Sequence, residues 1–125
     1  MATLTASVTV HDSGPGPYIL VTLAGEADIT GSETLNTVLE AQARKEPALL
    51  IIEMSGLRYL DSAALQAIVH ANLALGSRGG RLALVAPHDN VARVLHMTEV
   101  DRLVQVFASV TEAAAAPRRQ AGSRS

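Results

Sequence analysis

The chain contains no cysteine and no tryptophan, and only one phenylalanine and two tyrosines among its 125 residues. Without cysteine, neither a disulfide framework nor a thiolate metal site can form, and this composition fits a reducing compartment. So few aromatic rings provide no stacking platform for nucleic-acid bases. The formal net charge of -2 comes with no basic stripe in the part expected to fold. We therefore expect no direct nucleic-acid partner.

Long apolar runs and a leader-like start are also missing. The first eight residues include neither a positively charged region nor an apolar one, which argues against a signal peptide. The longest apolar run covers residues 47–52, whereas a membrane helix needs roughly 20 apolar residues. We therefore expect a cytoplasmic protein that makes no membrane contact.

What the chain does contain is typical of one globular domain. Apolar residues make up 48% of the sequence and charged residues 18%. A chain of this length is enough for one domain and too short for two ordinary ones. We predict a domain over residues 1–116. Residues 117–125 contain no apolar side chain larger than alanine and are expected to form a disordered tail.

The periodicity of the apolar residues predicts strands and helices in alternation. Apolar and polar residues alternate in the first segment, and a turn-rich stretch separates it from a β-branched one, so these two strands should form an antiparallel hairpin. The third run is apolar throughout, as in a parallel strand buried on both faces. The expected strands are residues 4–10, 18–24, 48–54, 81–86 and 103–107, and residues 25–28 and 55–60 are expected to be loops.

Helix-capping patterns lie between these strands. A capping box at residues 30–33 should start a helix that runs to about Lys45, and Asp61 should cap a second helix that ends near Ser77. Asp89 should cap a short third helix, and a capping box at residues 109–112 should start a fourth. The order β-β-α-β-α-β-α-β-α predicts an α/β fold, in which helices pack against a mixed sheet opened by an antiparallel hairpin.

No catalytic, metal-binding or cofactor-binding constellation is visible. The sequence has no nucleophile elbow, no P-loop and no dinucleotide fingerprint. Glu26 and Asp28 are two residues apart, while Asp61 stands alone among apolar neighbours, so no paired-acid site is supported. None of the histidines has a partner at a metal-ligand spacing, and structural or surface roles are expected for all of them. They are His11, His70, His88 and His96.

Residues 60–65 read Leu-Asp-Ser-Ala-Ala-Leu and place the Ser62 hydroxyl at the first turn of an expected helix. The free N–H groups of a helix N-terminus tolerate an anion, so a phosphate on Ser62 would not break the helix. Such a phosphate would add about -1.5 to -2 charges next to Asp61 and would repel a partner docked there. Plain capping by an Asp-Ser pair is the alternative, and the residues alone leave both interpretations open.

Four segments in consecutive order resemble the anti-sigma factor antagonist family, whose members consist of a STAS domain. The first is similar to the family's G-E-x-D segment after the second strand, and the second to its strand-loop-helix signature ending in Asp-Ser. The others resemble the next strand and the C-terminal helix and strand. These segments are residues 23–29, 49–62, 79–85 and 91–107. The resemblance spans roughly residues 4–112 and implies a single STAS-like domain.

The resemblance also implies a mechanism. In this family the serine after the aspartate is phosphorylated by an anti-sigma factor that is itself a serine kinase, which assigns that role to Ser62. The unphosphorylated form binds the anti-sigma factor and frees a sigma factor; phosphorylation releases it, and a PP2C-type phosphatase resets it. No catalytic activity of its own is implied. The implied partner-binding residues are Asp28, Asp61, Ser62, Ala63, Ala64 and Leu65.

The chain departs from the family pattern at three positions. The family usually reads Asp-Ser-Ser/Thr-Gly-Leu, whereas this chain has Ala63 and Ala64 after the serine, and Glu53 stands where aspartate is common. Ser62 is therefore the motif's only hydroxyl. The departure keeps a second hypothesis open, a constitutive STAS binding module such as a lipid-transport ATPase subunit or a signalling scaffold. A small enzyme is a third hypothesis and has no supporting constellation.

Overall fold

The computed structural model describes residues 3–12 and 16–116, which form a five-stranded sheet with the strands in chain order. The first two strands are antiparallel, and each later strand is parallel to the one before it. The strands are β1 (Thr5–His11), β2 (Tyr18–Ala27), β3 (Leu49–Leu60), β4 (Arg81–Val85) and β5 (Gln105–Phe107). The predicted α/β fold with a mixed sheet opened by a hairpin is confirmed.

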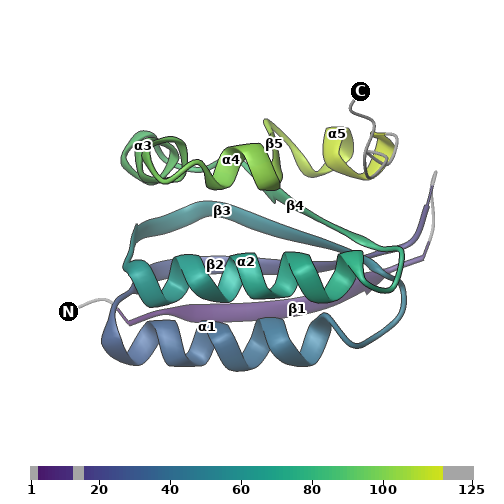
Figure 1. Ribbon diagram of the computed structural model, residues 1–125, viewed down its shortest axis with the longest axis horizontal. Helices are drawn as coiled ribbons and strands as arrows, with labels where there is room; N and C mark the ends of the chain where they lie inside the picture. The colour runs from purple at the N-terminus through teal and green to yellow at the C-terminus, as the bar shows by residue number, and fades with distance from the viewer. Residues whose placement is uncertain (1–2, 13–15, 117–125) are drawn as a thin grey trace.

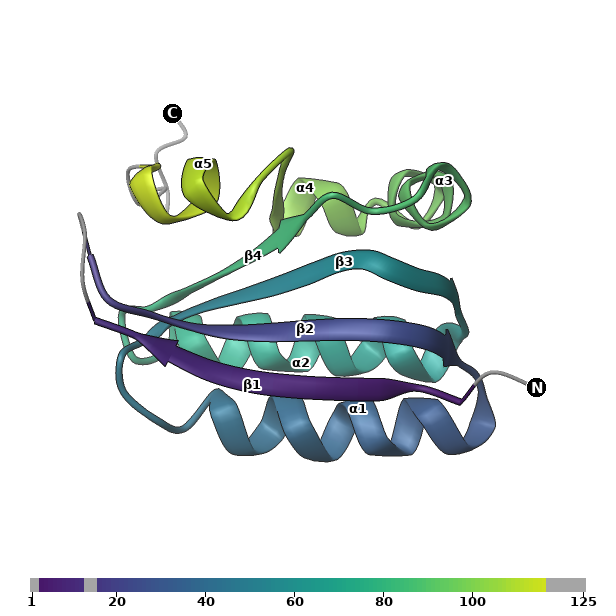
Figure 2. The ribbon, with the colours of Figure 1, turned by 180° about the vertical axis from the view of Figure 1, so that it is seen from behind.

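Five helices accompany the sheet in the described part of the chain. They are α1 (Ile29–Gln42), α2 (Ser62–Gly76), α3 (Asp89–Met97), α4 (Val100–Leu103) and α5 (Val110–Ala115). Figure 1 shows α1 and α2 side by side in front of the strands, and in Figure 2 the strands lie in front of α2. One face of the sheet is therefore covered by two long helices.

The buried side chains form two separate cores, one on each face of the sheet. The main core joins apolar residues of β2 and β3, such as Val21 and Ile52, to Leu35 of α1 and Ile68 of α2. The second core is small and lies on the opposite face, under α5. Its buried members are Ile51, Ala83, Val85 and Ala113. Helix α5 is thus the element that closes the second face around β4.

Strands β2 and β3 extend further than predicted. The stretches 25–28 and 55–60 were expected to be loops, but β2 continues to Ala27 and β3 to Leu60. Register shifts interrupt the ladder between Thr22 and Ala24 and between Gly25 and Glu26, and pairing resumes after each shift. Gly25 adopts a positive φ of 100°, which a side chain would disfavour. In the sequence, a glycine at a register shift cannot be told from a glycine in a turn. For this reason the two strand ends were wrongly predicted to be loops.

The helix boundaries also correct several predictions. The capping box at residues 30–33 is wrong, because α1 begins at Ile29 with Asp28 as its N-cap residue and ends at Gln42, before Lys45. The predicted caps Asp61 and Ser109 are confirmed, each accepting a hydrogen bond from a backbone N–H. Asp89 is the first residue of α3 and not its cap. Helix α4, which has only four residues, was missed, and the tail predicted at residues 117–125 lies outside the described residues.

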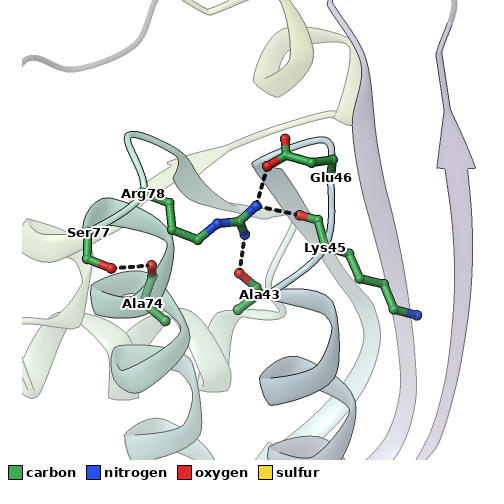
Figure 3. A network of polar contacts seen from close by, with 6 residues as sticks. All are labelled: Ala43, Lys45, Glu46, Ala74, Ser77 and Arg78. Carbon is green, nitrogen blue, oxygen red and sulfur yellow. Dashed lines mark hydrogen bonds and ion pairs between the residues drawn. The ribbon is translucent and has the colours of Figure 1, made fainter.

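The C-terminal ends of α1 and α2 are joined by Arg78 (Figure 3). Its guanidinium donates hydrogen bonds to the carbonyl oxygens of Ala43 and Lys45 and pairs with the Glu46 carboxylate. Carbonyls at a helix C-terminus have no partner within the helix, so an arginine from the turn after α2 can satisfy those at the end of α1. This contact fixes α1 against α2 at the ends that lie furthest from Ser62.

Candidate functional site

The predicted site residues gather where β2 and β3 end. Because these strands are parallel, their carboxyl ends lie at the same edge of the sheet, with Ala27 opposite Leu60. The Asp61 N–H donates to the Ala27 carbonyl oxygen at 2.9 Å and ties the two ends together. Asp28 and Asp61 are each the first residue after a strand and the N-cap residue of the helix that follows. The fold therefore brings the G-E-x-D and Asp-Ser segments together.

Asp61 orders the first turn of α2. Its Oδ1 accepts a hydrogen bond from the Ala64 N–H at 2.9 Å, and its carbonyl oxygen accepts from the Leu65 N–H at 3.1 Å. A carboxylate in this position accepts a hydrogen bond from one of the free N–H groups at the helix start. Its negative charge also interacts favourably with the positive end of the helix dipole. The cap thereby holds the backbone of Ser62 at the start of the helix.

Ser62 is the first residue of α2, and its side chain is exposed. Among the described residues, its hydroxyl has no hydrogen-bond partner. The Ser62 hydroxyl is therefore accessible to solvent at the start of α2.

The other residues of the motif differ in accessibility. Ala63 is exposed beside Ser62, whereas Ala64 is fully buried in the main core and Leu65 is half-buried against it. Asp28 and Asp61 are half-buried. Ser62 and Ala63 are thus the most accessible residues of the motif, Asp28, Asp61 and Leu65 are partly accessible, and Ala64 lies beneath them.

A groove continues from Ala63 along the outer surface of α1 and α2. Two adjoining cavities of about 280 and 250 Å³ share Asn36 of α1 and Ala67 and His70 of α2. Ala63 lines the first cavity, so the groove begins at the residue that follows Ser62 in the chain. Alanines on α2 leave this space open because they are too short to reach across to α1.

Two exposed residues near the motif were missed by the sequence reasoning. Arg58 and Tyr59 lie on the extension of β3, and the Tyr59 side chain is 48% exposed. Asn90 donates a hydrogen bond to the Arg58 carbonyl oxygen, which places the start of α3 beside this strand end. The available signal was the position of Tyr59, one of only two tyrosines in the chain, shortly before the Asp-Ser pair.

Within residues 3–12 and 16–116, no three histidine, aspartate or glutamate side chains come close enough to hold a metal ion. The helices in these ranges are all too short or too polar to span a bilayer. The strand-end surface contains the Ser62 hydroxyl and the carboxylates of Asp28 and Asp61.

The family of this chain follows from a comparison with protein-family models. The family model described as the STAS domain matches residues 7–113. The chain belongs to the STAS domain family. The matched region of this STAS domain includes all five strands except the first two residues of β1, together with the Asp61-Ser62 step. The resemblance noted in the sequence is confirmed at the level of the family.

Similar proteins of this family are known by sequence and by structure. A Thermotoga maritima protein, provisionally named an anti-sigma factor antagonist, is 35% identical over 71 residues, which are 57% of this chain and 63% of the relative. The match thus spans less than two thirds of that relative. An anti-sigma factor antagonist from Mycobacterium paratuberculosis has a similar structure, with a TM-score of 0.77 at 24% identity over 89% of this chain and 91% of its own. The anti-sigma factor antagonist SpoIIAA in its unphosphorylated form gives 0.69 at 18% identity over 86% and 92%. Both structures support the fold.

Proposed function

We propose that this STAS domain is an anti-sigma factor antagonist controlled by phosphorylation of Ser62. The unphosphorylated domain binds an anti-sigma factor that is also a serine kinase and so frees a sigma factor. The observation that carries the proposal is the Ser62 hydroxyl, exposed and unbonded within the described residues, at a helix start that Asp61 holds in place. The names of the relatives support the same class of partner.

Phosphorylation would change the charge of this surface without breaking the fold. The kinase transfers the γ-phosphoryl group of ATP to the Ser62 oxygen, ADP leaves, and the hydroxyl proton passes to a base of the kinase. The first N–H groups of α2 and its dipole accept the new anion. About -1.5 to -2 charges then join the carboxylates of Asp28 and Asp61. A partner fitted to a neutral hydroxyl is repelled and dissociates.

The remaining roles belong to partners. A PP2C-type phosphatase hydrolyses the phosphoserine and restores the binding form. The domain itself catalyses nothing, which accords with a Ser62 hydroxyl that has no bonded base among the described residues. Since sigma factors act on transcription inside the cell, we expect a cytoplasmic location.

The experiment uses the full chain, ATP and the histidine-kinase-like anti-sigma factor of the same organism, with intact-mass spectrometry and a binding assay. We expect one phosphate on the wild type and none on Ser62→Ala, which should stay bound to the kinase when ATP is present. Ser77→Ala is the matched control, because Ser77 is also exposed but lies at the other end of α2. Labelling of Ser62→Ala at the wild-type level would refute the proposal.

A constitutive STAS binding module is the second candidate. Ala63 and Ala64 stand where the family usually has a hydroxyl residue and glycine, so this motif differs from that of a typical switch. Purification of the complex from cells distinguishes the two functions. Recovery of a transport ATPase, with no kinase-like partner and no phosphate on Ser62, would favour the constitutive module.

A further inference from the structure

Another cavity lies away from the Ser62 surface and from the groove along α1 and α2, between α3, α4 and β5. These three elements lie together along one flank of the molecule, and α1 lies along the opposite flank (Figure 1). The cavity has a volume of about 330 Å³. Its lining residues are Pro87, Ala92, Leu95, Asp101, Gln105 and Val106. None of them belongs to the partner-binding motif.

The cavity has two polar side chains in an otherwise apolar lining. Asp101 Oδ2 is paired with His96 Nδ1 at 3.0 Å, and the carboxylate is 30% exposed while the imidazole is 82% exposed. Within the described residues, neither Asp101 Oδ1 nor the Gln105 side-chain amide has a hydrogen-bond partner. A concave site that combines apolar surface with a few unpaired polar groups is a common form of a small-molecule pocket.

The chemistry of the lining selects the charge of a ligand. An ionised aspartate only accepts hydrogen bonds, so Asp101 favours a donor with positive charge and disfavours an anion. The Gln105 amide oxygen can accept a second hydrogen bond from the same donor. Pro87 and the 40% exposed Val106 provide apolar surface for a hydrocarbon stem of a few carbons.

The backbone at the edge of the cavity is strained. Ala86 has a φ of 56°, a left-handed conformation rare for residues with a side chain, and it directly precedes Pro87 of the lining. Its N–H donates to the Phe107 carbonyl oxygen at 2.9 Å, which holds this conformation against β5. Strained backbone that the surrounding structure maintains is found preferentially at ligand and switch sites.

We propose that this cavity binds a small organic cation, an ammonium or guanidinium group on a short apolar stem. The cationic head pairs with Asp101 and hydrogen-bonds to Gln105, and the stem packs on Pro87 and Val106. The site is independent of the phosphorylation of Ser62.

The test is a titration of the 15N-labelled full chain, followed by amide chemical shifts, with three probes of matched shape. Isopentylamine is the cation, 3-methylbutanol the neutral analogue and isovalerate the anion. We expect isopentylamine to shift the amides of Ala92, Leu95 and Gln105 with saturation. It should bind about tenfold or more tightly than the alcohol, because a charge-assisted hydrogen bond is lost in the neutral probe.

Two variants of equal charge change show whether Asp101 is responsible. Asp101→Asn should bind the amine and the alcohol equally, and its own amide spectrum shows whether it is folded. Asp89→Asn is the matched control, because it removes an exposed carboxylate at the start of α3 and should keep the preference for the amine. Equal binding of isopentylamine and isovalerate by the wild type, shifts confined to other surfaces, or an unchanged preference in Asp101→Asn would each overturn the proposal.

Discussion

Asp28 and Asp61 occupy equivalent positions but have different roles. Each follows a strand and precedes a helix, yet only Asp61 accepts a hydrogen bond from the helix it caps. Replacing a bonded N-cap residue by alanine costs about 1 kcal/mol of the free energy of unfolding. We therefore expect Asp61→Ala to lower stability by this amount in urea unfolding and Asp28→Ala to lower it clearly less. A larger loss for Asp28→Ala would contradict the assigned cap.

Some residues of the candidate site could be predicted from the sequence, and others could not. Asp61 and Ser62 were identified correctly at a helix start, because capping depends on local chemistry that the sequence displays directly. The burial of Ala64 could not be read in the same way, since it depends on which face of α2 meets the sheet. Arg58 and Tyr59 were missed because their exposure depends on the extension of β3.

At the scale of elements, Arg78 connects the C-terminal ends of α1 and α2 (Figure 3). Its guanidinium serves two carbonyl groups and one carboxylate, and alanine would leave the two carbonyls without this donor. We expect Arg78→Ala to lower the free energy of unfolding by about 1–2 kcal/mol. Glu46 is 77% exposed, and an exposed ion pair is worth little, so Glu46→Ala should cost less than about 0.5 kcal/mol.

Thermal or urea unfolding of the two variants separates these contributions. If Glu46→Ala were as destabilising as Arg78→Ala, the ion pair and not the carbonyl contacts would hold the helix ends together. Arg78→Lys is an informative third variant. An ammonium group cannot reproduce the fork of an arginine, so this variant should lose part of the stability despite its conserved charge.

The number of the elements was largely predictable, and their limits were less so. Apolar runs and caps located five strands and four helices in the correct order, because these patterns are local. Helix α4 was missed because four residues are too few to display a helical period. The ends of β2 and β3 were misjudged because glycine is common in turns and also tolerates the close backbone contact at a register shift. Gly56 faces the Leu23 carbonyl in this way.

Across the whole molecule, the two faces of the sheet are covered unequally. The main core is closed by two long helices, whereas the second core depends on the short helix α5. Arg81 strengthens this cover by donating hydrogen bonds to the carbonyl oxygens of Ala113 and Ala116 at 2.8 and 3.0 Å, and burial lowers the pKa of its guanidinium. The sequence predicted α5 but not the face that it covers, because that choice depends on tertiary packing.

Because the two cores are separate, we expect a substitution in the second core to destabilise mainly the elements around it. Ala113 is fully buried against β3 and β4, so Ala113→Glu would place a carboxylate among apolar side chains. We expect it to lower the free energy of unfolding by about 2 kcal/mol or more. Ala115→Glu is the matched control on the exposed side of α5 and should change stability by less than about 0.5 kcal/mol.

Hydrogen exchange measures which elements lose amide protection in Ala113→Glu. Since the main core shares no buried residue with the second, amides of β2 should stay protected in Ala113→Glu while those of α5 and β5 exchange faster. Phosphorylation of Ser62 should continue in this variant, because the Asp61 cap lies on the intact face. Equal loss of protection in β2 and α5 would mean that the sheet and its second cover unfold as one unit.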